Sequence, residues 1–153
     1  METTTALEIL GEYLSDSAVS ILSQTFIEIE DPITTSIRFH ISYRLPCTLQ
    51  IGFDSVPVEH LDTLEEKLFA VFKEIVKDGI DMKRMATVIE VERNRNLLSV
   101  EKSPSHTLST KLIYEALYGT LDGESLQTNL KDLLYYDIVS KWTSDEWVAL
   151  LKR

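Results

Sequence analysis

The sequence has little cysteine, glycine or proline. Its 153 residues include a single cysteine, Cys47, with five glycines and four prolines. One thiol cannot close an internal disulfide, which argues against a disulfide-stapled secreted scaffold. So few glycines and prolines leave no room for low-complexity linkers. No apolar run approaches the ~18 residues that cross a bilayer, and the amino terminus is acidic where a leader would be basic. These absences predict a soluble intracellular protein, cytoplasmic, with a mitochondrial location left open if the chain is an internal fragment.

Basic residues are also scarce. Fifteen Lys and Arg face 25 Asp and Glu, which gives a formal net charge of −10. Such a charge argues against phosphate backbones and anionic membrane surfaces as partners, so neither nucleic acid nor membrane binding is expected. The hydrophobic share of 44% is that of an ordinary globular protein, and a chain of this length buries about 70% of its unfolded surface.

One stretch alternates between apolar and polar residues. The odd positions of residues 33–45 and 47–53 are apolar or aromatic in most cases, and the even positions are mostly polar. This period predicts two strands in an antiparallel hairpin over about residues 33–54, with its turn near Ser42 to Pro46. We expect the odd face of the hairpin to pack under the helix that follows.

Elsewhere the apolar residues recur at spacings of three and four, which predicts amphipathic helices. The expected helical segments are 6–14, capped by Thr3 to Thr5; 18–26, capped by Asp16 or Ser17; 61–75; 82–97; 105–117; and much of 122–153. Gly79 and Asp81 should supply the stop and the cap between two of them. The sequence therefore predicts an α+β fold: a small antiparallel sheet packed by several amphipathic helices, with a helical C-terminal third.

Motifs for catalysis are missing. None of His40, His60 and His106 fits H-E-x-x-H or its inverse H-x-x-E-H, and no nucleophile elbow or phosphate-binding loop occurs. We interpret the histidines, expected on a strand, a helix start and a loop, as surface or capping residues. Cys47 is interpreted as a small hydrophobe of the sheet, with a nucleophile as the lesser alternative. No catalytic, cofactor-binding or metal-binding residue is predicted.

Three charged stretches and one aromatic cluster have both a structural and a functional interpretation. Residues 28–31 and 62–66 lack the ligand spacing of a calcium loop and are expected to be solvated faces. Residues 90–95 are expected to form an exposed helix face of mixed sign, with a polar partner surface as the alternative. The aromatic cluster is interpreted as core packing, with a ligand pocket or partner groove as the alternative; its members are Tyr135, Tyr136, Trp142 and Trp147.

Five strings, taken in order, are similar to a known family. They are Leu7–Leu22 (LEILGEYLSDSAVSIL), Phe26–Pro32 (FIEIEDP), Leu49–Leu61 (LQIGFDSVPVEHL), Gly79–Arg84 (GIDMKR) and the tail from Tyr118 to Trp147. Together they resemble part of the pitrilysin/insulinase-type zinc metallopeptidases, in the presequence-protease-like branch with its fungal cytosolic relatives. Ile21 departs from the pattern, which has proline after Ser20.

The resemblance implies a particular part of that family. Its members enclose peptides between two homologous halves and hold zinc with H-x-x-E-H and a distal Glu, which this chain lacks. Residues 1–119 look like the non-catalytic α+β second domain without its first strand, and residues 120–153 like the start of the helical linker. The implied function is structural: part of the wall of a peptide-enclosing chamber, with no cofactor in this chain and zinc elsewhere in the parent protein. The implied partners are the remaining domains, with self-association through an uncovered strand edge. The alternative is a free-standing acidic protein-interaction module.

Overall fold

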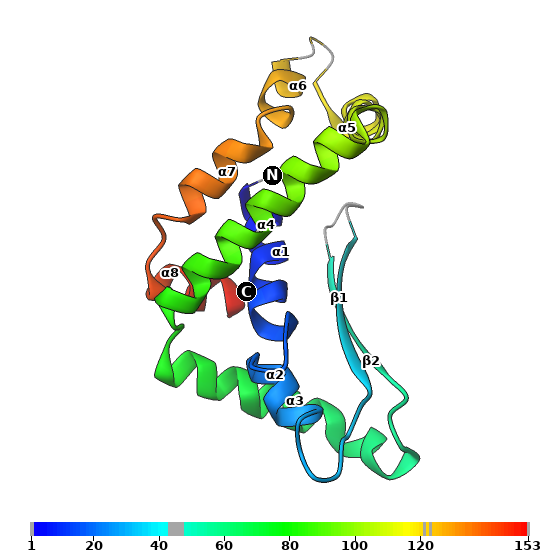
Figure 1. Cartoon of the computed structure of the whole chain (residues 1–153), viewed down its shortest axis with the longest axis vertical. Coiled ribbons are helices and arrows are strands. Elements are labelled where there is room, and N and C mark those ends of the chain that lie inside the picture. Colours follow the sequence, from blue (N-terminus) through cyan, green and yellow to red (C-terminus); the bar gives the residue numbers. More distant parts are fainter. Residues whose placement is uncertain (1, 43–47, 121, 123, 153) are drawn as a thin grey trace.

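The computed structural model describes residues 2–42, 48–120, 122 and 124–152 (Figure 1). In this part of the chain, eight helices accompany one two-stranded antiparallel sheet, which confirms the predicted α+β class. The elements are α1 (Glu2–Ser15), α2 (Ile21–Phe26), β1 (Ser36–Ser42), β2 (Thr48–Asp54), α3 (Val58–Asp78), α4 (Met82–Lys102), α5 (Pro104–Tyr118), α6 (Glu124–Asn129), α7 (Asp132–Val139) and α8 (Ser144–Leu151).

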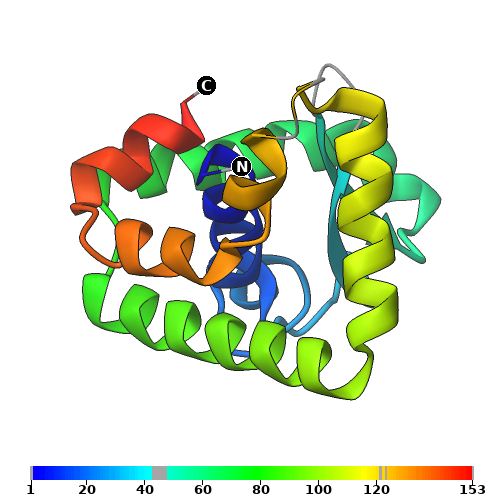
Figure 2. The same cartoon turned by 90° about the horizontal axis from the view of Figure 1, so that it is seen from above.

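Helix α1 lies at the centre of the molecule. Seen from above, α4, α7, α8 and the hairpin surround it (Figure 2), and it packs against α2, α4, α7 and β1. Its buried apolar side chains follow helical spacing: Ala6, Ile9, Leu10, Tyr13 and Leu14. Thr3 to Thr5 are not caps as predicted, because the helix already begins at Glu2 and includes them. The first helix of the sequence is therefore the element around which the core forms.

The hairpin has the predicted pairing but a different neighbour. Its register joins odd to odd residues, with Phe39 opposite Ile51 and Ile41 opposite Leu49. Its main helical neighbour is α1 rather than α3, under which it was expected to pack. The reason lies at Gly11, where an added Cβ would come within 3.0 Å of the Phe39 ring. A residue without a side chain lets β1 approach α1 closely. The predicted turn and Cys47 lie outside the described residues, apart from Ser42 at the end of β1.

Helix α2 begins later than its predicted caps. Ser20 is the N-cap, and its hydroxyl accepts a hydrogen bond from the Ser23 N–H at 3.3 Å. Asp16 lies too far upstream to cap this helix and pairs instead with Arg84 of α4. Val19, within the helix predicted for residues 18–26, instead precedes the cap and is 70% exposed.

The turn between α3 and α4 has both predicted signals. Gly79 ends α3 with a φ of +82°, a conformation that glycine adopts without steric cost. Asp81 caps α4 by accepting hydrogen bonds from the N–H groups of Lys83 and Arg84. Two distant residues hold the turn: the Ile80 N–H donates to Ser144 Oγ at 2.9 Å and the Asp81 N–H to Tyr13 Oη at 3.1 Å. The turn is therefore fixed by α1 and α8 as well as by its own sequence.

The chain after α4 first leaves the core and then returns. Ser103 ends α4, and α5 starts at Pro104, as the predicted break implies. No described residue from 104 to 135 is buried. Helices α7 and α8 then pack back on α1 and α3 and bury Tyr136, Val139 and Trp147. A capping box between Thr143 and Glu146 starts α8, and the hydrogen bond from the Thr143 N–H lowers the pKa of Glu146.

Candidate functional site

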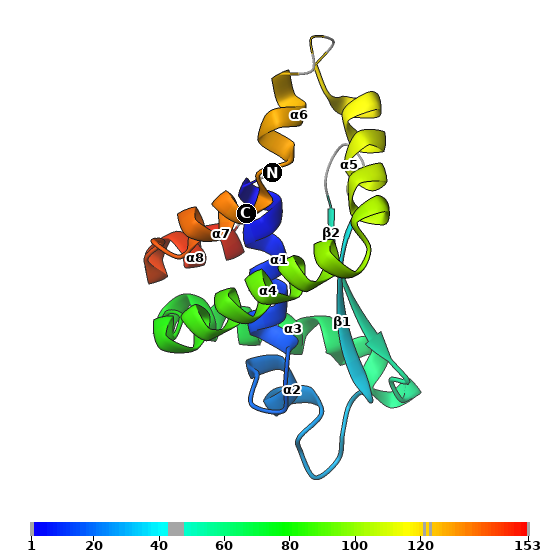
Figure 3. The same ribbon diagram turned by 45° about the horizontal axis from the view of Figure 1, so that its top comes forward.

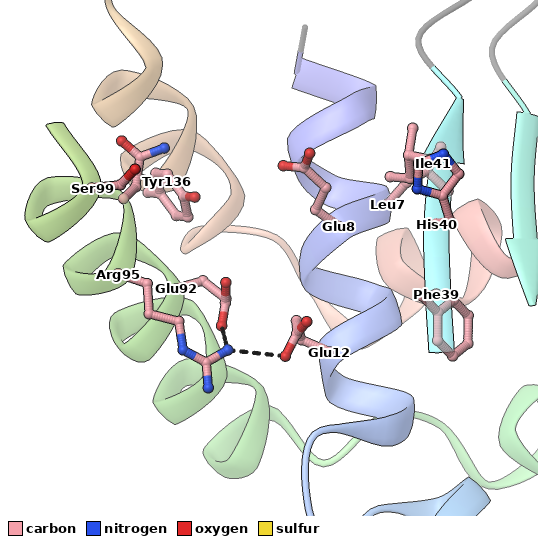
Figure 4. Close-up of a pocket in the computed structure, with 11 residues that line it drawn as sticks. Leu7, Glu8, Glu12, Phe39, His40, Ile41, Glu92, Arg95, Ser99 and Tyr136 are labelled. Atoms are coloured by element: carbon pink, nitrogen blue, oxygen red, sulfur yellow. Dashed lines mark hydrogen bonds and ion pairs between the residues drawn. The ribbon is translucent and has the colours of Figure 1, made fainter. Parts of the chain in front are cut away.

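The site with the most varied chemistry is a groove between α1, β1, α4 and α7. Its volume is about 450 Å³. It is lined by Leu7, Glu8, Glu12, Phe39, His40, Ile41, Glu92, Arg95, Asn96, Ser99 and Tyr136 (Figure 4).

Helical spacing places its polar residues. Glu8 and Glu12 are four residues apart on α1, so they share one face of that helix. Glu92, Arg95 and Ser99 recur at three and four on α4. The two helices pack against each other, which turns these faces toward one another. The result is a polar seam beside the apolar contact of α1 with α4.

A shared guanidinium links the two helices. Arg95 Nη1 lies 3.1 Å from Glu12 Oε2 and also hydrogen-bonds Glu92 on its own helix (Figure 4). Burial raises the pKa of Glu92, and the nearby charge of Glu12 raises it further. The charge of Glu92 in turn raises the pKa of Arg95. Three carboxylates, Glu8, Glu12 and Glu92, thus outnumber the single guanidinium of the groove.

The excess of carboxylates over guanidinium in the lining favours a cationic group over an anionic one. Its hydroxyls are those of Ser99 and Tyr136, and its imidazole is that of His40, on the exposed face of β1. Glu92, Arg95 and Tyr136 belong to stretches with a predicted functional alternative, whereas Glu8 and Glu12 were not among the predicted candidates. The signal was a pair of acidic residues four apart, Glu8 and Glu12, within the apolar-periodic part of the helix. The exposed helix face of mixed sign predicted for residues 90–95 is exposed at four of its six positions, while Glu92 and Arg93 are half-buried.

The residues that the structure describes do not fit a zinc site. His40 lies on β1, His60 in the first turn of α3 and His106 in α5, where a loop had been predicted. Proline is favoured at the first position of a helix, which is why α5 already includes the residues after Pro104. Within the described ranges, no three His, Cys, Asp or Glu side chains gather closely enough to hold a metal ion.

The other candidate residues have structural roles. The carboxylates of residues 28–31 and 62–66 are exposed, as expected of solvated faces. Trp147 is fully buried and its ring centre lies 4.9 Å from that of Trp142, which confirms core packing for this pair. Tyr136 is buried in the core and also lines the groove. Among the residues that the structure describes, no helix is both long and apolar enough to cross a membrane.

Comparison with known families identifies the family of this chain. Residues 2–91, more than half of the chain, match the family described as the peptidase M16 inactive domain. The chain belongs to the peptidase M16 inactive-domain family. This confirms the resemblance to the non-catalytic part of pitrilysin/insulinase-type proteins. The M16 match runs from α1 into α4 and so includes the hairpin and most groove residues.

Curated relatives are similar along almost the whole chain. An uncharacterized protein of Schizosaccharomyces pombe is 38% identical over 99% of this chain, and one of Saccharomyces cerevisiae is 30% identical over 97%. An uncharacterized protein of Caenorhabditis elegans is 28% identical over 100%. This M16 chain spans only 14%, 14% and 16% of these three proteins. No solved structure matches the chain.

Proposed function

We propose that this chain is the non-catalytic second-domain part of a longer M16 protein that degrades peptides, and that it forms part of the chamber wall. The observation that carries the proposal is the match of residues 2–91 to the M16 inactive domain. The relatives support it, because this chain corresponds to about one seventh of their length, 14% in the two yeast proteins.

The chemistry of the described residues supports a structural role. Hydrolysis by zinc needs protein ligands that leave a coordination position open for water, and the three histidines of this chain lie on separate elements. In the proposal, zinc and the catalytic base come from another part of the polypeptide, and the remaining domains are the partners of this one. We propose a presequence-protease-like branch and a cytoplasmic location. The division into residues 1–119 and 120–153 stays a prediction.

The hairpin is the element that supports a place in a larger sheet. The described strands form a sheet of two, and two strands are marginal without further packing. One face of the hairpin rests on α1, while Arg38, His40 and Gln50 of the other face are exposed. An added strand at either open edge would satisfy its backbone groups and extend that polar face into a wall.

The test compares this chain with the complete polypeptide that its gene encodes. The 153-residue chain, incubated with zinc and a fluorogenic peptide, should show no turnover. The complete polypeptide should hydrolyse the peptide, lose turnover to a chelator and regain it with zinc. Chelator-sensitive turnover by the repurified chain alone would overturn the non-catalytic assignment, and an inactive complete polypeptide would overturn the peptide-degrading one.

A deletion tests the proposal that this chain forms part of the chamber wall. The complete polypeptide without residues 1–153 should lose turnover, and Val58→Ala, at a side chain that is 80% exposed, should retain it. Turnover that is unchanged by the deletion would overturn the proposed role in the chamber wall. It would favour the alternative, an acidic protein-interaction module that functions without the peptidase.

A further inference from the structure

Helix α5 has its polar and apolar faces the opposite way round from a helix in a folded core. Its half-buried residues are Thr107, Lys111 and Glu115, which are four apart and so form one polar stripe. Glu115 in that stripe accepts a hydrogen bond from Ser125 of α6. The covered side of α5 is therefore its polar side.

The C-terminal half of the side opposite to that stripe is apolar and open, whereas the N-terminal half carries His106 and Ser109. Leu112, Ile113 and Leu117 are 51%, 58% and 64% exposed, and Ala116 between them is exposed as well. These four residues are named here the outer face of α5. At 100° per residue, Ile113 points almost directly away from the polar stripe. Figure 3 shows α5 at the rim of the molecule, with no described helix or strand on its outer side.

This arrangement is unusual for a surface helix. An amphipathic helix on a protein surface turns its apolar stripe to the core and its polar residues to water. Single exposed apolar residues need no explanation, but a contiguous apolar patch marks an interaction site. The outer face consists of four apolar side chains, which suit an apolar occupant.

A second copy of this chain is a poor occupant. A stable interface buries about 800 Å² on each partner and uses about 20–30 residues a side, whereas the outer face consists of four side chains. Two copies would also each bring a formal charge of −10, which opposes their association. A segment of the same polypeptide needs no such area, because it does not lose the translational and rotational freedom of a separate molecule.

We infer that the outer face of α5 is the docking surface for an apolar part of the same polypeptide that lies outside residues 1–153. The inference rests on the proposed function, in which this chain is one part of a longer M16 protein. It adds the contact surface: four residues outside the family match of 2–91, on a helix that buries none of its own residues in this chain.

Photo-crosslinking in the complete polypeptide tests the inference. A benzoylphenylalanine replaces Leu117 in one sample and Val58, 80% exposed on α3, in the control. We expect the Leu117 position to crosslink at least tenfold more than the Val58 position. The product should keep the mass of a monomer, and mass spectrometry should join residue 117 to a peptide outside residues 1–153.

Each other outcome overturns the inference. A product of twice the monomer mass would assign the face to a second copy. Crosslinks only within residues 1–153, or a yield equal to that at Val58, would show that no other part of the polypeptide covers it. A double variant, Ile113→Asp with Leu117→Asp, gives a second measurement, since it should lower the melting temperature of the complete polypeptide by several degrees. Val58→Asp should leave that temperature unchanged, and an equal effect of the two would also contradict the docking surface.

The two proposals fail separately. Dimer-mass crosslinks in a protein that still degrades peptides would overturn the docking surface alone. An intramolecular crosslink in a protein without peptide turnover would leave the docking surface and overturn the proposed function.

Discussion

Helices α1 and α5 are nearly the same length, 14 and 15 residues, yet they have opposite relations to the rest of the chain. Helix α1 buries a stripe that runs from Ala6 to Leu14, and α5 buries none of its residues. Both are well supplied with leucine and isoleucine. The difference shows that apolar residues at helical spacing identify a helix and its apolar face. Whether that face is buried depends on which neighbouring elements reach it.

The polar residues of the two helices complete the comparison. On α1, Glu12 meets Arg95 of α4 at the edge of a buried apolar contact. On α5, a polar stripe around Lys111 and Glu115 takes the inward position itself. The polar contact on α1 lies beside a buried apolar contact, which supplies most of the stabilisation. On α5 the polar stripe takes the place of an apolar contact, and surface ion pairs stabilise a helix only a little.

The largest expected effect contrasts two isoleucines. Ile9→Ala removes a fully buried side chain from α1 and should lower the free energy of unfolding by about 2–5 kcal/mol. In the 153-residue chain, which does not contain the proposed occupant of the outer face, Ile113→Ala at a side chain that is 58% exposed on α5 should change it by less than about 0.5 kcal/mol. Urea unfolding of both variants checks the pair. Equal losses would mean that α5 is as well packed as α1.

A smaller effect concerns close approach. Gly11→Val on α1 places carbon atoms where the Phe39 ring lies, since even a Cβ there comes within 3.0 Å. Overpacking of this kind costs about 1–3 kcal/mol. Ala116→Val on the exposed α5 meets no such neighbour and should cost only about half a kcal/mol, through helix propensity. Adding Phe39→Ala to Gly11→Val should recover part of the loss, and strictly additive losses would show that the two residues do not compete for space.

The N-caps of α4 and α5 should differ in their contribution to stability by about 1 kcal/mol. Asp81 caps α4 through its side chain, so Asp81→Ala should cost about 0.5–2 kcal/mol. Ser103 precedes α5 without a side-chain hydrogen bond to it, and Ser103→Ala should therefore be nearly neutral. Thermal melts of the two alanine variants, side by side, measure this. If Asp81→Ala left the melting temperature unchanged, the Asp81 side chain would not stabilise α4 as a cap.

The smallest effect is a pH dependence at the groove. Burial and the charge of Glu12 raise the pKa of Glu92 above its ordinary value of 4.5. A carboxyl with a raised pKa binds more protons in the folded state, so its contribution to stability falls as the pH rises through the window above 4.5. The free energy of unfolding of the Glu92→Gln variant should therefore rise relative to that of the wild type between pH 4 and pH 7, by less than about 1 kcal/mol. Glu90→Gln, exposed on the same helix, is the control. A gain in the opposite direction would contradict the assignment.

Local chemistry made much of the fold predictable. Gly79 and Asp81 mark the turn between α3 and α4 because the chain needs a left-handed residue and a cap there, and both needs are met within a few residues. The odd-to-odd register of the hairpin follows from its period of two in the same way. Short-range rules suffice where the partner of a residue is close in sequence.

What could not be predicted depends on distant partners. The hairpin was expected under α3, but Gly11, some 28 residues before Phe39, decides that it packs on α1. Glu8 and Glu12 become part of a groove only because α4 packs beside α1. No local pattern contains either pairing. The absence of predicted catalytic, cofactor and metal residues stays a prediction for the chain as a whole.

The hydrogen bonds that hold the turn between α3 and α4 have a consequence for synthesis. The Ile80 N–H finds its acceptor on Ser144, 64 residues later, and Trp147 of the same helix completes the core. While a ribosome is still making residues 104–143, α1 to α4 lack both the acceptor and the indole. The emerging chain must wait with an open apolar surface until α8 leaves the exit tunnel. During that interval a chaperone has its opportunity to bind.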